Sequence, residues 1–221
     1  MRLSSKKFNV HSQNGEDGII SHLLSCIPND NWCCEFGAWD GIFLSNTYNL
    51  VSSRGYNAVY IESNEEKFKD LLKLSQKNDK VIPINSYVDV EGEKSLDEIL
   101  KKTVISRNFD ILSIDVDGID YLIWQAFTQY KPKIVVIEIN SGMKPDFLMR
   151  DEDLKLDVML KHVYENSTTS GVNFSTCYWL GRSKGYRLAA HTGNMIFVDE
   201  TYLDKIEGLA TDENYLQYFK R

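Results

Sequence analysis

Short apolar runs recur along the chain, and amphipathic stretches separate them. Turn residues follow each of five runs, which predict strands over residues 32–37, 58–62, 80–85, 109–115 and 133–139. Apolar residues at helical spacing predict helices over residues 15–27, 45–55, 64–76, 95–102 and 119–127. Strands that are apolar on both faces and alternate with helices indicate a parallel sheet covered on both sides.

The C-terminal part departs from this alternation. Residues 187–200 read as two strands joined by a tight turn, His-Thr-Gly-Asn, which predicts an antiparallel hairpin. The expected fold is therefore α/β, a doubly wound (Rossmann-like) and mostly parallel sheet that finishes with a C-terminal antiparallel hairpin.

No internal repeat and no Pro-, Gly- or Ser-rich linker divides the sequence, so residues 1–221 are predicted to form a single domain. Within it we expect an N-terminal helical segment over residues 12–30. The stretch 141–172 is long for a connection in such a fold, and long excursions at strand ends often serve as lids or acceptor-binding elements.

Composition narrows the class of protein. A net charge of -7 argues against nucleic acid as a partner, because neutralising phosphates requires clustered Lys and Arg. The sequence has no apolar run of the ~18 residues that a membrane span requires, and no apolar core of a signal peptide. We therefore expect no membrane span and a cytoplasmic location. The four cysteines form no CxxC pair, which favours buried thiols over structural zinc.

Ligands of open parallel sheets bind beyond the carboxyl ends of the strands. Acidic or amide residues end the predicted strands here, at Glu35, Glu62, Asn85, Asp115, Asp117, Glu138 and Asn140. Carboxylates suit a ligand with ribose hydroxyls, ammonium or sulfonium. A pyrophosphate is disfavoured, because the first loop has no GxGxxG or GKS/T cradle.

Several motifs occur in a characteristic order: EFGAWDG (35–41), YIES (60–63), DVDG (115–118) and GYRLAAHTGNMIFV (185–198). With SQNGEDGII (12–20) and FLSNTYNL (43–50), this series resembles the class I S-adenosylmethionine-dependent methyltransferases, and within them the FkbM-like sugar and polyketide O-methyltransferases. The resemblance covers roughly residues 12–198, apart from the 141–172 stretch.

The resemblance implies S-adenosylmethionine as cofactor. The cofactor-binding residues it implies are Gln13, Glu35, Gly37, Gly41, Ser45, Glu62, Asn85, Ser86 and Asp115. In this interpretation the two glycines admit the backbone close to the methionine portion, Glu62 takes the ribose hydroxyls, and Asn85 or Ser86 meets the adenine edge. Trp39 stands where many such loops have glycine, so its ring is expected to wall the cofactor or acceptor pocket. Gln13 is equally compatible with ordinary first-turn chemistry of a helix.

Two mechanisms remain open for the chemistry. Asp117, Glu138 and Asn140 lie at the tips of adjacent strands and could hold Mg²⁺, which would lower the pKa of an acceptor hydroxyl. In the metal-free alternative Asp117 is the general base, assisted by His191 or Asp120. Polar turn residues and a hydrogen-bonded structural histidine would explain the same positions without catalysis.

The function that this sequence favours is an O-methyltransferase acting on a small-molecule acceptor with hydroxyl groups. The resemblance suggests a sugar, a nucleotide sugar or a similar polyhydroxylated metabolite, as in surface polysaccharide biosynthesis. One alternative is a metal-dependent glycosyltransferase that uses Asp115 and Asp117 as a D-x-D pair. Another is a non-catalytic nucleoside-binding module with the 141–172 stretch as its partner surface.

Overall fold

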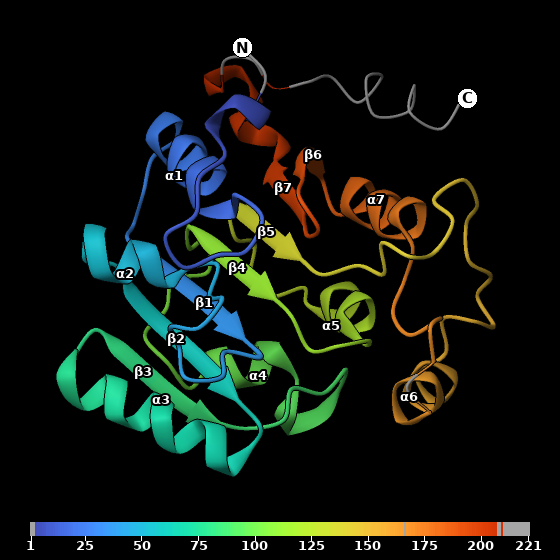
Figure 1. The fold of residues 1–221 in the computed structure, drawn as a ribbon, viewed down its shortest axis with the longest axis horizontal. Coiled ribbons are helices and arrows are strands. Elements are labelled where there is room, and N and C mark those ends of the chain that lie inside the picture. Colours follow the sequence, from blue (N-terminus) through green and yellow to red (C-terminus); the bar gives the residue numbers. More distant parts are fainter. Residues whose placement is uncertain (1–2, 166, 207–208, 210–221) are drawn as a thin grey trace.

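A single mixed sheet runs through the computed structural model, which describes residues 3–165, 167–206 and 209 (Figure 1). In this part of the chain the strand order is β3-β2-β1-β4-β5-β7-β6. The strands are β1 (Trp32–Phe36), β2 (Asn57–Glu62), β3 (Val81–Asn85), β4 (Ile111–Ile114), β5 (Ile134–Ile137), β6 (Tyr186–His191) and β7 (Met195–Asp199). Strands β1 to β5 are parallel, and β7 is antiparallel to both β5 and β6. The predicted doubly wound sheet with a C-terminal antiparallel hairpin is confirmed.

Helices cover both faces of the sheet. The 3-10 helix η1 (Leu3–Lys6) and helices α1 (Glu16–Cys26), α2 (Tyr48–Arg54) and α3 (Glu65–Lys77) pack on one face. Helices α4 (Leu96–Leu100), α5 (Asp120–Ala126) and α7 (Phe174–Ser183) pack on the other. Two short 3-10 helices follow β3 and β7, η2 (Gly92–Lys94) and η3 (Glu200–Lys205). Helix α6 (Leu156–Tyr164) lies within the predicted excursion and stands away from the sheet (Figure 1).

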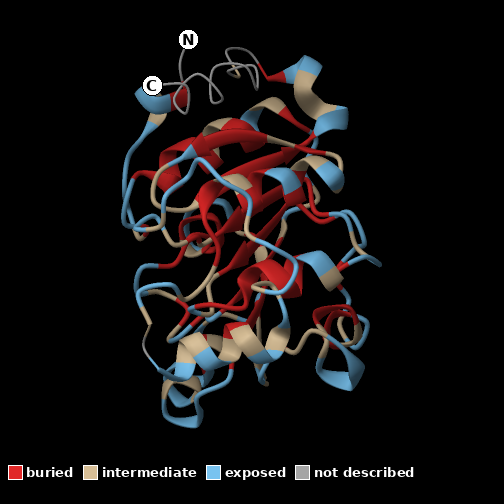
Figure 2. Cartoon of the chain, turned by 90° about the vertical axis from the view of Figure 1, so that its right-hand side faces the viewer, coloured by how far each residue is buried: buried red, intermediate tan, exposed pale blue. Residues whose placement is uncertain are grey.

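The strands are apolar on both faces because each face has its own helix layer. Cys33 belongs to the core cluster on one side of the sheet and Cys34 to the cluster on the other, as expected for neighbours in a strand. Buried residues accordingly follow the central strands, and exposed residues lie on the outer helices and loops (Figure 2). Cys33, Cys34 and Cys177 are buried free thiols, as predicted, whereas Cys26 is half-buried.

An ion pair anchors the amino ends of β4 and β5. Lys133 Nζ lies 2.6 Å from Asp110 Oδ1 and also donates to the Pro28 carbonyl at 2.8 Å. The side chains of the pair are 7% and 0% exposed. Asp110 further accepts hydrogen bonds from the backbone N–H groups of Asp30 and Asn31. These contacts fix the end of the sheet opposite the predicted site.

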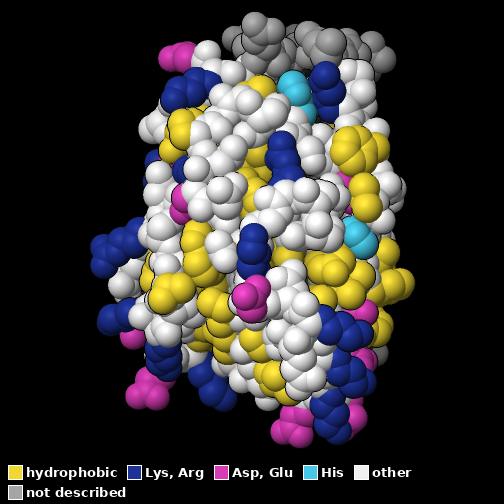
Figure 3. All heavy atoms as spheres, turned by 90° about the vertical axis from the view of Figure 1, so that its left-hand side faces the viewer, with side chains coloured by type: hydrophobic (Ala, Val, Ile, Leu, Met, Phe, Trp, Pro, Cys, Tyr) yellow, Lys and Arg dark blue, Asp and Glu magenta, His cyan; other side chains and the backbone are white. Residues whose placement is uncertain are grey.

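On the surface that carries α2 and α3, basic and acidic side chains are interspersed and hydrophobic side chains lie between them (Figure 3). None of the helices in the described ranges combines the length and the apolar character needed to cross a bilayer.

Candidate functional site

The sheet register gathers the predicted residues along one edge. Glu62 pairs with Asn85 at the ends of β2 and β3. The Asp115 N–H donates to the Phe36 carbonyl at 3.3 Å, and the Glu138 N–H donates to the Ile114 carbonyl at 3.0 Å. The carboxyl ends of β1 to β5 therefore present their acidic and amide side chains side by side.

The two glycines of the first loop are required by close packing. A Cβ at Gly37 would lie 1.7 Å from the backbone oxygen of Asp115, and one at Gly41 would lie 2.8 Å from Leu74 Cδ2. Both glycines also have positive φ, at 73° and 77°. Because neither residue has a side chain, the loop after β1 can pack directly against the loop after β4 and against helix α3.

Glu35 organises the start of the next helix. Its buried carboxylate accepts hydrogen bonds from Ser45 Oγ at 2.6 Å, Thr47 Oγ1 at 2.5 Å and the Asn46 N–H at 3.1 Å. Burial raises the pKa of Glu35, and these hydrogen bonds oppose the rise. Glu35 and Ser45 thus contact each other and shape the chain beside the loop; their proposed contact with a cofactor stays a prediction.

Glu62 holds the Trp39 loop. Its two carboxylate oxygens accept from the Trp39 N–H at 2.9 Å and the Asn64 N–H at 2.7 Å. Trp39 itself has a φ of 52°, is 43% exposed, and packs edge-on against Phe43 beneath Lys67 Nζ. Glu62 is only 5% exposed, and each of its oxygens retains a second lone pair, so its predicted contact with ribose hydroxyls stays a prediction.

The two residues predicted at the adenine edge are Asn85, which ends β3, and Ser86, which follows it. Asn85 Nδ2 donates to the Glu62 carbonyl at 2.8 Å, and the Ser86 N–H donates to the same oxygen at 3.2 Å. Ser86 Oγ donates to the Tyr87 carbonyl. Both residues are therefore fixed next to Glu62, and their proposed contact with an adenine ring stays a prediction.

Gln13 lies exposed in a loop that precedes α1, so the predicted N-terminal helical segment becomes helical only at Glu16. Asp17 Oδ2 folds this loop by accepting from the N–H groups of Val10, His11 and Ser12. Glu16, fully buried, accepts from Thr192 Oγ1 at 2.7 Å. The loop is thereby tied to the β6–β7 turn.

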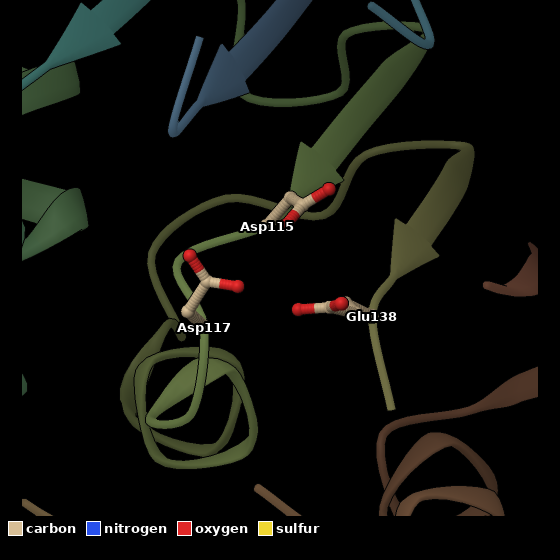
Figure 4. Close-up of side chains that lie close together, drawn as sticks. All are labelled: Asp115, Asp117 and Glu138. Carbon is tan, nitrogen blue, oxygen red and sulfur yellow. The ribbon is translucent and has the colours of Figure 1, made fainter. Parts of the chain in front are cut away.

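Three carboxylates converge beyond β4 and β5. Asp115, Asp117 and Glu138 offer oxygens that all lie within 4.8 Å of one another, and the side chains of Asp117 and Glu138 point toward each other (Figure 4). Burial, and then the charges of Glu138, Asp120 and Asp117, raise the pKa of Asp115 to about 8. Burial and the neighbouring aspartates raise the pKa of Glu138 to about 7. We call Asp115, Asp117 and Glu138 the carboxylate cluster.

The sequence prediction grouped Asn140, rather than Asp115, with Asp117 and Glu138. The Asn140 amide donates to the carbonyls of Thr168 and Ser170, both at 2.8 Å, and its oxygen accepts from the Gly142 N–H at 3.0 Å. This side chain therefore holds the excursion against the strand end. The Asp115-x-Asp117 spacing was the sequence signal for the third carboxylate.

Asp120 and His191, the residues predicted to assist Asp117, make structural contacts of their own, and their assisting role stays a prediction. The Asp120 carboxylate accepts from the N–H groups of Val116 and Gly118, both at 2.8 Å, and so fixes the loop that bears Asp117. His191 lies on the edge strand β6 and pairs with Met195 of β7, which in turn pairs with Ile137 of β5. It is thus separated from the end of β5 by two strand spacings, or about 10 Å. Desolvation lowers the pKa of His191, whose ring packs edge-on against Phe174.

A cavity of about 680 Å³ opens beside the cluster. Asp117 and Glu138 form part of its wall, and the remaining walls come from the start of α5, from residues 139–141, and from Val163, Ser167 and residues 170–172. Its volume lies in the range of small-molecule sites. No sequence signal pointed to the serines of its lining, Ser141, Ser167 and Ser170.

Comparison with known proteins identifies the fold but no close relative in sequence. No description of a protein family matches the chain, and no curated protein matches it in sequence. A solved structure of the CurJ carbon methyltransferase aligns with a TM-score of 0.51 and 12% identity, over 82% of this chain and 52% of that one. The fold is that of the class I methyltransferases.

Two further solved structures have slightly lower TM-scores. An O-methyltransferase family protein from Burkholderia thailandensis has a TM-score of 0.49 and 10% identity, over 81% of this chain and 53% of that one. The N-terminal domain of EvdMO1, solved in the presence of SAH and D-fucose, has a TM-score of 0.48 and 11% identity, over 86% and 84% of the two chains. The chain spans about half the length of the first two proteins. Membership of the FkbM-like family stays a prediction.

Proposed function

We propose that this protein is an S-adenosylmethionine-dependent O-methyltransferase for a small molecule with hydroxyl groups. The observation that carries the proposal is the carboxylate cluster, which lies at the carboxyl edge of a class I methyltransferase sheet and borders a cavity of about 680 Å³. The ordered motifs of the FkbM-like enzymes support a sugar or another polyhydroxylated metabolite as acceptor.

The residues around the first loop fit the cofactor. Glu62 keeps free lone pairs at the strand end, and Asn85 and Ser86 are fixed beside it. Bound S-adenosylmethionine would supply an electrophilic methyl group on a positively charged sulfur. Glu62 would hold its ribose, and the N-terminal loop with Gln13 would cover its methionine end. Gly37 and Gly41 let the loop after β1 pack closely enough to lie beside the proposed cofactor position.

The carboxylate cluster supplies a proton acceptor. A general base works best when its pKa lies near the working pH, and the pKa of Glu138 is raised to about 7. Asp117, which lies exposed at the cavity, would accept the proton of the acceptor hydroxyl, and Glu138 stands within reach to share it. The cavity walls would align the hydroxyl oxygen and exclude water from it. In this proposal His191 takes no part in the proton transfer and has only a structural role on the edge strand β6.

A divalent cation at the cluster is the second candidate mechanism. Three carboxylate oxygens within 4.8 Å of one another suit the hard-oxygen preference of Mg²⁺. In that case Asp115 would serve as a ligand with Asp117 and Glu138, and Asn140 would position the excursion. The cation would lower the pKa of the acceptor hydroxyl in place of a general base.

The two other functions that the sequence left open make different predictions. A glycosyltransferase would bind UDP-sugars through Asp115 and Asp117, and a non-catalytic module would bind the nucleoside without turnover. Titration with UDP-glucose separates the first from a methyltransferase. The second predicts that neither the wild type nor Asp117→Asn transfers a methyl group.

The first experiment is calorimetric titration with S-adenosylhomocysteine, in Mg²⁺ and again in EDTA. We expect micromolar binding in both buffers, and absence of binding in both would refute the proposed function. Glu62→Gln should weaken binding by about tenfold or more, since one acceptor oxygen is lost. Glu65→Gln, an exposed neighbour on α3, serves as the matched control. Asp117→Asn should keep the affinity and abolish methyl transfer.

A further inference from the structure

All the charged residues that line the cavity beside the carboxylate cluster are acidic. Its charged lining residues are Asp117, Asp120 and Glu138. No lysine, arginine or histidine occurs among the lining residues that the structure describes. The wall therefore carries negative charge that no cationic side chain in that wall neutralises.

The three acidic residues of the wall differ in how many hydrogen bonds and ion pairs the protein gives their carboxylates. Asp120 accepts two backbone N–H groups at 2.8 Å and is buried, so its charge is stabilised internally. Within the described part of the chain, Asp117 and Glu138 take part in no ion pair, and neither does Asp115 behind them. One proton transfer needs a single carboxylate, so the cluster holds more carboxyl groups than the reaction uses. A cation bound between them would favour their ionised forms.

The rest of the lining offers hydrogen-bond acceptors to a ligand with several hydroxyls. Ser141 Oγ and Ser170 Oγ direct their own protons toward the carbonyls of Gly193 and Asp117, each at 3.4 Å. Their lone pairs remain available to ligand O–H groups. A phosphate or carboxylate on the ligand would meet like charge in this cavity, whereas an ammonium group would meet opposite charge.

We propose that the acceptor bound in this cavity is an amine-bearing polyol, such as an amino sugar or amino alcohol, and not a phosphorylated sugar or sugar nucleotide. The proposal rests on the proposed function and narrows its substrate class. The ammonium group binds between Asp117 and Glu138, and the serine hydroxyls receive the ligand's O–H groups. The extra carboxyl groups of the cluster are thus the recognition element, and the phosphates of a nucleotide sugar would be repelled by them.

Three matched sugars test this assignment: glucosamine, glucose and glucose 6-phosphate. Each is titrated calorimetrically at about pH 6.5, where the amine is protonated, in EDTA and with and without S-adenosylhomocysteine. We expect glucosamine to bind at least about tenfold more tightly than glucose, and glucose 6-phosphate to bind at least about 100-fold more weakly than glucosamine. Undetectable glucosamine binding, equal binding of glucosamine and glucose, or comparable binding of glucose 6-phosphate would each overturn the proposal.

Variants locate the effect. Glu138→Gln and Asp117→Asn should each remove most of the preference for glucosamine over glucose, whereas Glu152→Gln, an exposed acid of the same excursion, should leave it unchanged. A preference that survives in both cluster variants also overturns the proposal. If the wild-type protein does not bind S-adenosylhomocysteine, the proposed function is refuted. If it binds S-adenosylhomocysteine but does not prefer glucosamine to glucose, only this inference is refuted.

Discussion

Replacing Asp115 by asparagine should make the protein relatively more stable as the pH rises. The unfolded chain loses this proton near the ordinary pKa of 3.8, whereas the folded chain holds it up to about pH 8. Between these values the folded state binds more protons than the unfolded state, so the free energy of unfolding falls as the pH increases. Asparagine does not ionise, and the variant lacks this fall.

The size of the effect follows from the shift. At 1.36 kcal/mol per pKa unit, the contribution has a ceiling of roughly 5 to 6 kcal/mol. Asp115 is half-buried, so solvent screens part of the repulsion, and we expect about 2 to 3 kcal/mol between about pH 5 and about pH 9. For a chain of this length that corresponds to a change of about 5 to 10 °C in the melting temperature.

Scanning calorimetry of wild type and Asp115→Asn at about pH 5, 7 and 9 measures this difference. The melting temperature of the variant minus that of the wild type should rise steadily across the series. Asp146→Asn, at an exposed position, controls for the general loss of one negative charge. Parallel pH profiles of wild type and Asp115→Asn would show that Asp115 is not held in the strained, protonated form inferred from its burial and its neighbours.

Three further predictions concern the scaffold and the cluster. Lys133→Met should lower the free energy of unfolding by about 3 to 5 kcal/mol in urea titrations, because Asp110 stays buried without its cation; Lys131→Met, whose lysine is half exposed, should cost less than about 1 kcal/mol. Gly37→Ala should destabilise the fold far more than Gly92→Ala. The two positions have similar positive φ, but only a Cβ at Gly37 would meet backbone atoms. Similar losses of unfolding free energy in the two variants would refute the packing argument. If Mg²⁺ binds the cluster, it should raise the melting temperature of the wild type and not of Glu138→Gln, and EDTA should reverse the rise.

The strand and helix pattern was predictable because each sheet face is covered. Residues such as Cys33 and Cys34 are both apolar yet face different helix layers, which gives the continuous hydrophobic runs of a parallel sheet. The hairpin was readable from its turn residues. The long stretch after β5 was recognisable as an excursion, but nothing in its pattern gave the position of α6.

Side-chain roles at the site were only partly predictable. The sequence placed Glu35, Glu62 and Asp115 at strand ends, yet it could not show that Glu35 is engaged by Ser45 and Thr47, residues that fold back over it. Asn140 illustrates the same difficulty, since the two partners of its amide nitrogen lie about thirty residues further along the chain. Strand position follows from local pattern, whereas the partners of a polar side chain depend on loops whose path is set by the whole fold.

The hydrogen bond between Glu16 and Thr192 has a consequence for the order in which the molecule is assembled. Its partners are 176 residues apart, so during synthesis the N-terminal loop emerges long before the turn that satisfies its buried glutamate. At ribosomal rates of about 5 to 20 residues per second, the delay is on the order of ten seconds or more. Strands β1 to β5 can pair during that time, but the loop bearing Gln13 reaches its final form only when the last hairpin docks. The hydrogen bond that ties the loop bearing Gln13 to the hairpin thus forms late in folding, after the strands that carry Glu35 and Glu62.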